Sequence, residues 1–159
     1  MRIYAYHKIH KSFHQMKNVL LVLLLLVLNV FSLKAQNKIV AQILNFENNK
    51  GVCRACLFNS AASFSGDGGE PFRCLQLPVK GKVAEAVFEN IPSGNYAIFV
   101  FHDENANNKI DKNFVGIPKE GYGASKNKLP FAGAPTFEEN KFYVAPNRPT
   151  TLTIKLRNL

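Results

Sequence analysis

Residues 82–101 read KVAEAVFENIPSGNYAIFVF, and this stretch decides the fold class. In its first half, apolar side chains recur at every second position, the period that a strand with one buried face requires; they are Ala84, Ala86 and Phe88. Residues 91–94 follow with Pro second and Gly fourth, which is typical of a type I turn. The stretch therefore predicts a strand, a tight turn and a second strand.

The second strand, residues 95–101, carries apolar side chains on both of its faces. That pattern predicts a strand covered on both sides. Working outward, further short runs rich in β-branched and apolar residues are separated by turn signals, and they span residues 38–46, 52–59, 72–79, 141–145 and 150–157. Residues 48–51, Asn-Asn-Lys-Gly, indicate a hairpin-type turn between the first two runs.

Sustained helical spacing of apolar residues does not occur in the chain after the leader. Six or seven short strands with turn signals between them predict an all-β protein. The expected fold is an antiparallel, immunoglobulin-like or prealbumin-like β-sandwich of about seven strands.

The N-terminus has the order of a cleaved signal peptide. Basic residues precede an apolar run over residues 19–28, and a small residue, Ala35, stands at a plausible cleavage point. Asn29 interrupts the run well short of the roughly 20 apolar residues that a membrane-spanning helix needs. We expect residues 1–36 to be removed on export, with residues 1–15 as a start-site artefact if translation begins at Met16. Residues 37–159 then form a single β domain.

Export decides how the charge is interpreted. Five of the 20 Lys and Arg and none of the 11 Asp and Glu lie in residues 1–36, which leaves 15 against 11 and a net charge of +4. Mild positive charge favours solubility and weak contact with anionic surfaces. Nucleic-acid binding is not expected, because the chain has no basic stripe or interleaved aromatic platform. The expected location is the periplasm or cell envelope of a Gram-negative bacterium.

Three cysteines follow the leader: Cys53, Cys56 and Cys74. Cys53 and Cys56 lie three residues apart in a predicted strand and so point to opposite faces, which argues against a bridge between them. We interpret the three as small buried thiols, a common environment for free Cys. A disulfide from Cys74 to one of the other two is the alternative in an exported protein.

Residues 103–137 contain no clear strand or helix, only Gly, Pro, Asn and scattered aromatics. Structureless loops of this length are uncommon in compact domains and usually functional or disordered. Apolar side chains that a solvated linker would not carry favour an ordered loop, held partly by those side chains; they are Phe114, Val115, Ile117, Tyr122, Leu129, Phe131 and Phe137.

The start of this loop has the spacing of a calcium site. Oxygen-bearing side chains occupy relative positions 1, 3, 5 and 9 of an EF-hand-type loop; they are Asp103, Asn105, Asn107 and Asp111. Calcium needs six to eight oxygens, and this spacing lets one turn supply several of them. Asn108 stands where Gly is usual, and Asn tolerates the left-handed conformation.

The match to an EF-hand is incomplete. Phe114 stands where a bidentate Glu is expected, and the missing carboxylate would come from Glu120, Glu138 or Glu139. We expect calcium affinity on the order of 10⁻⁴–10⁻³ M, typical of extracellular modules. The alternative is an Asn-rich turn capped by its own side chains.

Two interpretations of the remaining polar and aromatic residues follow. A binding surface for an envelope protein, a peptide or a glycan would use Tyr122, Phe131 and Phe137, unless these side chains simply pack the loop onto the sheet. A hydrolase would use His102 as base, Ser125 as nucleophile and Asp111 as orienting acid. Ser125 lacks the Gly-x-Ser-x-Gly elbow, and we assign no catalytic residue. A purely structural or transport-associated accessory domain is a further alternative, which the sequence does not separate from the binding module.

Three segments carry a family resemblance: Gly94-Asn95-Tyr96-Ala97-Ile98, His102-Asp103-Glu104-Asn105-Ala106-Asn107, and residues 116–125, with Pro135-Thr136-Phe137-Glu138 downstream. The chain resembles the bacterial domain-of-unknown-function family numbered 2141 over about residues 39–156. The resemblance implies an exported protein with a small β-sandwich domain and an uncharacterised function. The family pattern has Gly where Ala106 or Asn108 stands here, and the three Cys look peculiar to this chain.

Overall fold

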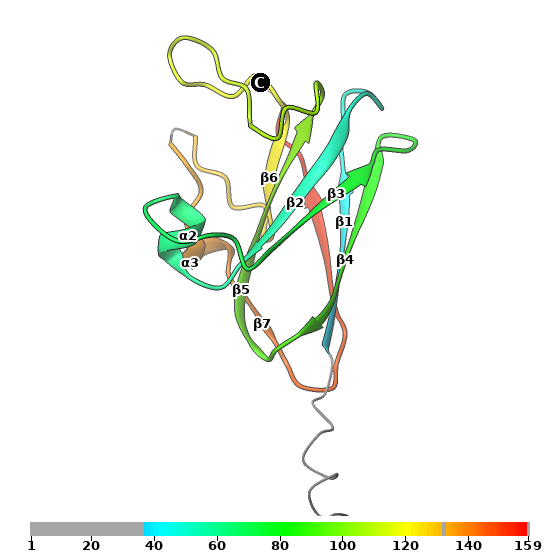
Figure 1. Ribbon diagram of the computed structural model, residues 1–159, viewed down its shortest axis with the longest axis vertical. Helices are drawn as coiled ribbons and strands as arrows, with labels where there is room; N and C mark the ends of the chain where they lie inside the picture. Colours follow the sequence, from blue (N-terminus) through cyan, green and yellow to red (C-terminus); the bar gives the residue numbers. More distant parts are fainter. Residues whose placement is uncertain (1–36, 132, 159) are drawn as a thin grey trace, which may run out of the picture. The chain divides into compact units, whose positions relative to one another are not determined.

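A computed structural model describes residues 37–131 and 133–158. The predicted signal peptide, residues 1–36, lies outside these residues. The described part of the chain is mostly β structure with two short helices (Figure 1). Its elements are β1 (Asn37–Leu44), β2 (Val52–Phe58), α2 (Ala61–Ser65), β3 (Arg73–Pro78), β4 (Val83–Ile91), β5 (Gly94–Asp103), β6 (Tyr122–Ala124), α3 (Phe137–Asn140), β7 (Phe142–Val144) and β8 (Thr150–Lys155).

The strands form two sheets. The three-stranded sheet has the order β4-β1-β8, and the five-stranded sheet has the order β3-β2-β5-β6, with β7 paired to the beginning of β5. Every pair is antiparallel except β1 with β8, which is parallel from Ile39 opposite Thr150 to Leu44 opposite Lys155. The all-β prediction is confirmed, and the antiparallel prediction is wrong for this one pair.

The predicted hairpin at residues 48–51 is also wrong. β1 and β2 belong to different sheets, so the turn carries the chain from one sheet to the other. Gly51 is required at this crossing because its φ is +60° and a Cβ atom there would lie 2.1 Å from the backbone oxygen of Asp103. The turn is therefore packed against the end of β5, next to the start of the long loop.

The two sheets bury one shared hydrophobic core. Alternate residues of β1 and β4 point into it from the three-stranded sheet, and alternate residues of β2 and β5 point into it from the other. These residues are Ile39, Ala41, Ile43, Ala84, Ala86 and Phe88 from the first sheet, and Cys53, Ala55, Leu57, Tyr96, Ile98 and Val100 from the second. The predicted buried face of residues 84–88 is thus confirmed.

The second face of β5 is covered, as its apolar pattern predicted. Phe99 stacks on Tyr122 of β6 with ring centroids 6.2 Å apart, and it meets Phe64 of α2 edge to face at 6.4 Å. Phe64 in turn meets Phe137 of α3 at 6.1 Å. The two helices therefore cover part of the outer face of the five-stranded sheet.

The disulfide joins Cys56 to Cys74, and Cys53 is free and buried. Cys56 and Cys74 face each other across the β2–β3 pair, with their Cα atoms 4.1 Å apart. The interpretation of all three Cys as buried thiols is wrong for this pair and confirmed for Cys53. The reason is the pairing of β2 with β3: Cys56 lies on the face of β2 that points away from the core, directly opposite Cys74 on the edge strand β3.

Candidate functional site

The long loop that leaves β5 lies at the end of the molecule where β1 connects to β2 (Figure 1). Its first residue, Asp103, is the last residue of β5 and is fully buried. One carboxylate oxygen of Asp103 accepts a hydrogen bond from the backbone N–H of Asn107 at 3.0 Å, and the other accepts from that of Asn108 at 2.9 Å. The buried carboxylate thereby folds the chain back into a tight turn.

The turn uses left-handed backbone conformations at Ala106 (φ 56°) and Asn108 (φ 67°). The prediction that Asn108 takes the conformation usual for Gly is confirmed. The Asn108 side chain also accepts a hydrogen bond from the guanidinium of Arg54 on β2, which ties the turn to the sheet.

The structure brings the four predicted calcium ligands together. The side-chain amide of Asn105 donates to one oxygen of Asp111 at 2.7 Å, and that of Asn107 donates to the other at 3.0 Å. The amide oxygens accept from the backbone: Asn105 Oδ1 from Asn107 N at 3.1 Å, and Asn107 Oδ1 from Lys109 N at 2.8 Å. These contacts match the alternative, a turn capped by its own side chains.

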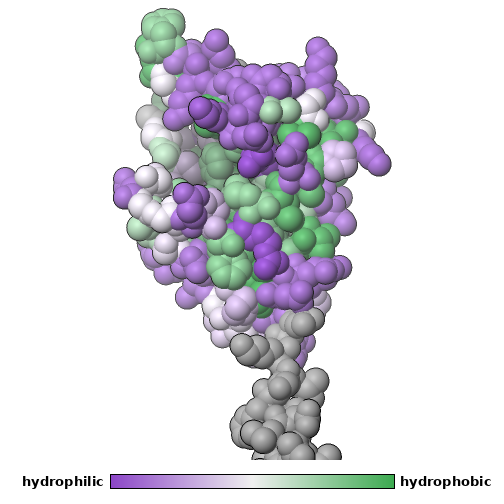
Figure 2. Space-filling model, in the orientation of Figure 1, coloured by the Kyte–Doolittle hydropathy of each residue, from purple (hydrophilic) through white to green (hydrophobic). Residues whose placement is uncertain are grey.

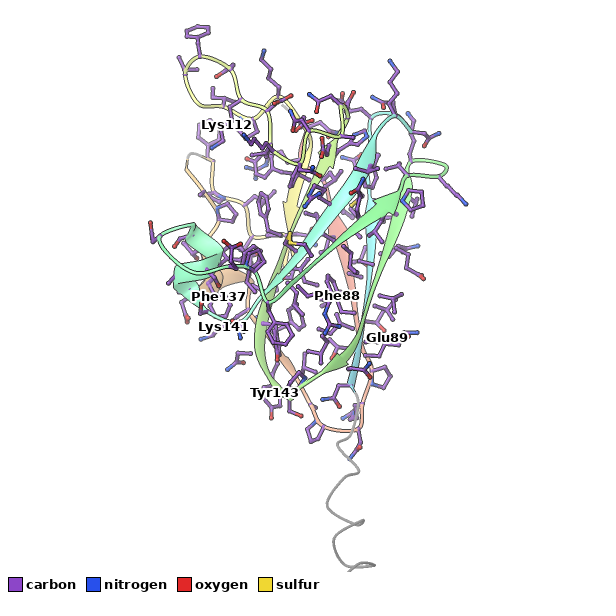
Figure 3. All side chains as sticks on the ribbon, in the orientation of Figure 1. Phe88, Glu89, Lys112, Phe137, Lys141 and Tyr143 are labelled. Atoms are coloured by element: carbon purple, nitrogen blue, oxygen red, sulfur yellow. A yellow bond between two sulfur atoms is a disulfide. The ribbon has the colours of Figure 1, made fainter. Side chains whose placement is uncertain are left out.

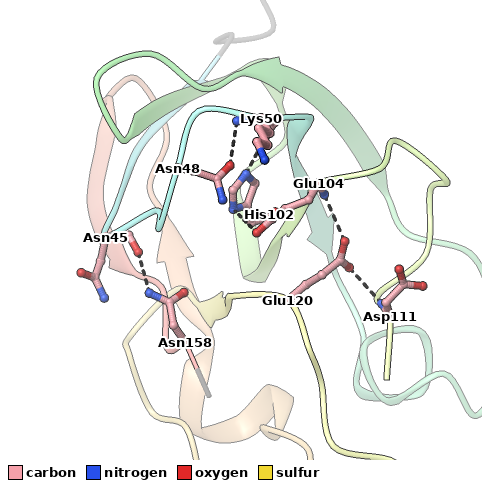
Figure 4. A network of polar contacts seen from close by, with 8 residues as sticks. All are labelled: Asn45, Asn48, Lys50, His102, Glu104, Asp111, Glu120 and Asn158. Carbon is pink, nitrogen blue, oxygen red and sulfur yellow. Dashed lines mark hydrogen bonds and ion pairs between the residues drawn. The ribbon is translucent and has the colours of Figure 1, made fainter. Parts of the chain in front are cut away.

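Glu120 closes the loop, and of the three carboxylates considered from the sequence it is the one that lies there. Its side chain is 6 % exposed, and its two oxygens accept from the backbone N–H groups of Glu104 at 3.0 Å and Asp111 at 2.9 Å (Figure 4). Glu138 and Glu139 lie on α3 instead, paired with Lys141 and Thr136. Glu120 therefore fixes the two ends of the 104–111 turn relative to each other.

In the described ranges, no group of three or more His, Cys, Asp or Glu side chains gathers as a metal cluster. The candidate set in the loop combines carboxylates with Asn amides. Its oxygens are of the hard type that suits calcium.

His102, beside this turn, has a structural environment. It is 1 % exposed, and its Nε2 donates to the backbone oxygen of Lys50 at 2.7 Å, because a carbonyl can only accept. Its Nδ1 lies 3.6 Å from a carboxylate oxygen of Glu104 (Figure 4). Its ring lies nearly perpendicular to that of Phe46, with the ring centroids 5.0 Å apart. The residue therefore holds the 48–51 turn against the end of β5.

Ser125 does not join His102. Its hydroxyl is buried, donating to the backbone oxygen of Asn140 at 2.6 Å and accepting from the backbone N–H of Ile98 at 3.1 Å. Ile98 and His102 are four residues apart on β5, a separation of about 13 Å along a strand. The three groups of the hydrolase interpretation thus have other partners in this structure.

The three aromatic residues considered for binding have different environments. Tyr122 is 7 % exposed against Phe99, and Phe137 is 8 % exposed against Phe64, so both pack the loop and α3 onto the sheet. Phe131 is fully exposed. The structure does not bring the three side chains together as one exposed surface.

Of the apolar loop residues that we expected to pack, Phe131 is exposed, and so are three that follow one another closely in sequence: Phe114, Val115 and Ile117. They follow the Asp111 turn and project from the molecule, and the prediction that they hold the loop down is wrong. The physical reason is that backbone N–H groups donate hydrogen bonds to the side chains of Asp103, Asn113 and Glu120, and these bonds order this part of the loop without the apolar side chains.

Burial changes the acidity of one side chain in the core beneath this end of the molecule. Removal from water raises the pKa of the Cys53 thiol from its ordinary value of 9.0 to about 12. The neutral thiol is therefore an inert part of the core at neutral pH.

These observations define a small mostly-β domain of two sheets, with an ordered, oxygen-rich loop at one end. The family described as "Uncharacterized protein conserved in bacteria (DUF2141)" matches residues 41–152. The chain belongs to this bacterial family, as the resemblance implied. No curated protein and no solved structure matches the chain. Neither helix of the described residues has the length and hydropathy that crossing a membrane requires.

Proposed function

We propose that this protein is an exported, non-enzymatic module of the bacterial cell envelope. In this proposal its two sheets form an immunoglobulin-like or prealbumin-like sandwich, and its long loop is organised by calcium to present a binding surface. The signal-peptide pattern of residues 1–36 and membership of a bacterial family support the location. Loops held on rigid β scaffolds commonly carry binding.

One observation carries the proposal: the predicted ligand side chains converge although they come from nine residues of loop. Asp103 and Asp111 offer two carboxylate oxygens each, and Asn105 and Asn107 offer one amide oxygen each. Each of these oxygens accepts at least one hydrogen bond, and the carboxylate oxygens keep a free lone pair. These oxygens reach the lower end of the six to eight that calcium takes, and water can add to them.

Calcium binding at Asp111 requires the side-chain amides of Asn105 and Asn107 to rotate, because their NH2 groups, and not their oxygens, face the Asp111 carboxylate. Asp103 fixes the turn through backbone N–H groups, whereas the carboxylate of Asp111 accepts from the two Asn amides, and Asp111 is partly exposed. Gathering two carboxylates in one turn without a cation costs electrostatic energy. A bound divalent cation would remove this repulsion, so we expect calcium to stabilise the folded protein.

The experiment is thermal unfolding of residues 37–159 in chelator and then in about 10 mM calcium. With a dissociation constant near 10⁻⁴ M, linkage gives roughly 2.7 kcal/mol of stabilisation. For a domain of this size, the melting temperature rises by about 10 °C.

The informative variant is Asp111→Asn, which keeps the shape of the side chain and removes one charge. We expect it to lose most of the calcium-dependent rise, while Glu104→Gln, a partly exposed neighbour, keeps the rise. Asp103→Ala is a poor choice because it also removes the cap of Asn107 and Asn108. An equal melting temperature in chelator and calcium would leave a turn capped by its own side chains and would end the calcium proposal.

A further inference from the structure

The most exposed apolar residues of the described chain include a group at the outer bend of the loop. Phe114 is 100 % exposed, Val115 61 % and Ile117 47 %. We call these three residues the apolar tip. In Figure 2, hydrophobic residues form the projecting end of this loop, beside a mostly hydrophilic region along the top of the molecule. Such a group on a surface marks an interaction site more often than a scattered single residue does.

The apolar tip is built on an ordered support. The side-chain oxygen of Asn113 accepts from the backbone N–H of Val115 at 3.1 Å and from that of Ile117 at 2.9 Å. The backbone N–H of Asn113 donates to the oxygen of Ile117 at 2.8 Å, and Lys112 pairs with Pro118 in an isolated bridge. The side chains therefore project from a closed turn, and little conformational entropy is lost when they bind.

The charges around the apolar tip are mostly positive. Lys109, Lys112 and Lys119 are exposed, and Asp111 is the one acidic residue within 109–119. The carboxylate of Asp111 already accepts two amide hydrogen bonds. Apolar side chains on a projecting bend with lysines at its base are complementary to a bilayer that has anionic headgroups.

We infer that the apolar tip inserts into an anionic lipid bilayer, with the lysines at the headgroups. This inference rests on the proposed role of the loop as a binding surface and does not require calcium. A protein partner fits less well, because a stable protein interface buries at least about 1,000 Å², whereas the apolar tip is one narrow, projecting bend. A second copy fits less well because it would bring like charges together.

The test places a fluorescent reporter in the apolar tip. The chain contains no Trp, so Phe114→Trp gives a signal from this position alone. The protein used in this test comprises residues 37–159, because the whole described core lies within residues 39–156. In chelator, vesicles of phosphatidylcholine mixed with phosphatidylglycerol should shift the Trp emission to the blue, and brominated lipids should quench it. Vesicles of phosphatidylcholine alone should have a much weaker effect.

Tyr143→Trp is the matched reporter control. Tyr143 is also an exposed aromatic residue, and it lies toward the opposite end of the molecule from Lys112 (Figure 3). Its Trp emission should not change with either vesicle. If both reporters respond equally, adsorption is not through the apolar tip, and the inference is overturned.

Two substitutions test the two kinds of contact in vesicle sedimentation. Phe114→Asp removes the apolar anchor and should lower binding to anionic vesicles by about tenfold or more. Lys112→Glu reverses one charge at the base and should lower it by about tenfold. Lys38→Glu, near the start of β1, is the matched control and should change binding by less than about twofold. All three positions are exposed, so the melting temperature should stay that of the parent protein.

Three further outcomes would overturn the inference. The first is unchanged Phe114→Trp emission with anionic vesicles. The second is self-association that Phe114→Asp abolishes in analytical ultracentrifugation, because the occupant would then be a second copy. The third is full vesicle binding by Phe114→Asp. If calcium raises the melting temperature but the protein does not bind vesicles, the bilayer inference is wrong and the calcium proposal stands. If the protein binds vesicles but calcium does not raise the melting temperature, the calcium proposal is wrong and the bilayer inference stands.

Discussion

Glu120 connects the two ends of the 104–111 turn. Its buried carboxylate accepts the N–H groups of Glu104 and Asp111. Hydrogen bonds to a charged group are worth more than neutral ones, and losing an acceptor leaves buried donors unsatisfied. We predict that Glu120→Ala lowers the free energy of unfolding by about 2–4 kcal/mol, measured by urea denaturation.

A Gln at position 120 shows how much of the stabilisation depends on the negative charge of Glu120 and how much on its acceptor oxygens. Glu120→Gln keeps one acceptor oxygen, so its loss should be clearly smaller than that of the Ala variant. Glu138→Ala, an exposed carboxylate on α3, serves as the control and should stay within about 0.5 kcal/mol of the parent protein. Equal stability of Glu120→Ala and the parent protein would mean that the 104–111 turn holds without this residue.

Cys53 gives the protein a pH dependence in the alkaline range. Its pKa is raised from 9.0 to about 12 by burial, so the folded protein keeps the thiol protonated where the unfolded chain loses the proton. The contribution to stability is therefore complete below about pH 9 and is lost as the pH rises toward 12. Burial also raises the pKa of Tyr96, which acts in the same direction.

We predict that the urea midpoint of the parent protein falls as the pH rises above about 9, and that Cys53→Ala flattens this fall. The variant is expected to be less stable at neutral pH, because it leaves a cavity in the core. The slope with pH, and not the absolute midpoint, is the test. An unchanged slope in Cys53→Ala would show that this thiol does not cause the alkaline loss.

The grouping of side chains in the loop could be predicted from the sequence where similar residues recur at regular spacing. The spacing of Asp103, Asn105, Asn107 and Asp111 was enough to predict that these side chains gather in one turn. The exposure of Phe114 was not predictable in the same way. Apolar composition alone cannot distinguish a side chain that packs from one that a hydrogen-bonded turn holds outward.

At the scale of elements, the disulfide attaches the edge strand β3 to β2. It joins residues 18 apart in sequence, and a closed loop of this size restricts the unfolded chain by about 3 kcal/mol. We predict that Cys56→Ala combined with Cys74→Ala lowers the free energy of unfolding by about 3 kcal/mol.

A reductant should lower the stability of the parent protein by a similar amount and leave the double variant unchanged. Cys53→Ala should respond to reductant like the parent protein, because Cys53 is outside the disulfide. A parent protein indifferent to reductant would contradict the role assigned to the bridge.

Most strands could be predicted because their apolar residues alternate over six or more positions, as in β4 and β5. β6 was missed because three residues are too few to show a period. The helices α2 and α3 were missed for the same reason, although Ser60 and Thr136 cap them in the usual way. The parallel pairing of β1 with β8 joins distant segments, and no local pattern reports it.

At the scale of the whole described domain, the two sheets contain the hydrophobic core, and the long loop contains the clustered carboxylate and Asn side chains. The sheets bury their apolar faces in one core, whereas the loop is ordered by carboxylates and Asn side chains. This division explains how a loop can expose the apolar tip without weakening the fold. It also means that changes in the loop can be measured separately from changes in the core.

The most direct test of the central claim is a calcium titration followed by ¹⁵N–¹H nuclear magnetic resonance. We predict that amide shifts concentrate in residues 104–111 and at Glu120, with a dissociation constant on the order of 10⁻⁴–10⁻³ M. Amides of β1 and β4 should stay unchanged. If the amides of residues 104–111 do not respond at millimolar calcium, the loop is ordered by its own hydrogen bonds, and the proposal of a calcium-organised binding surface is wrong.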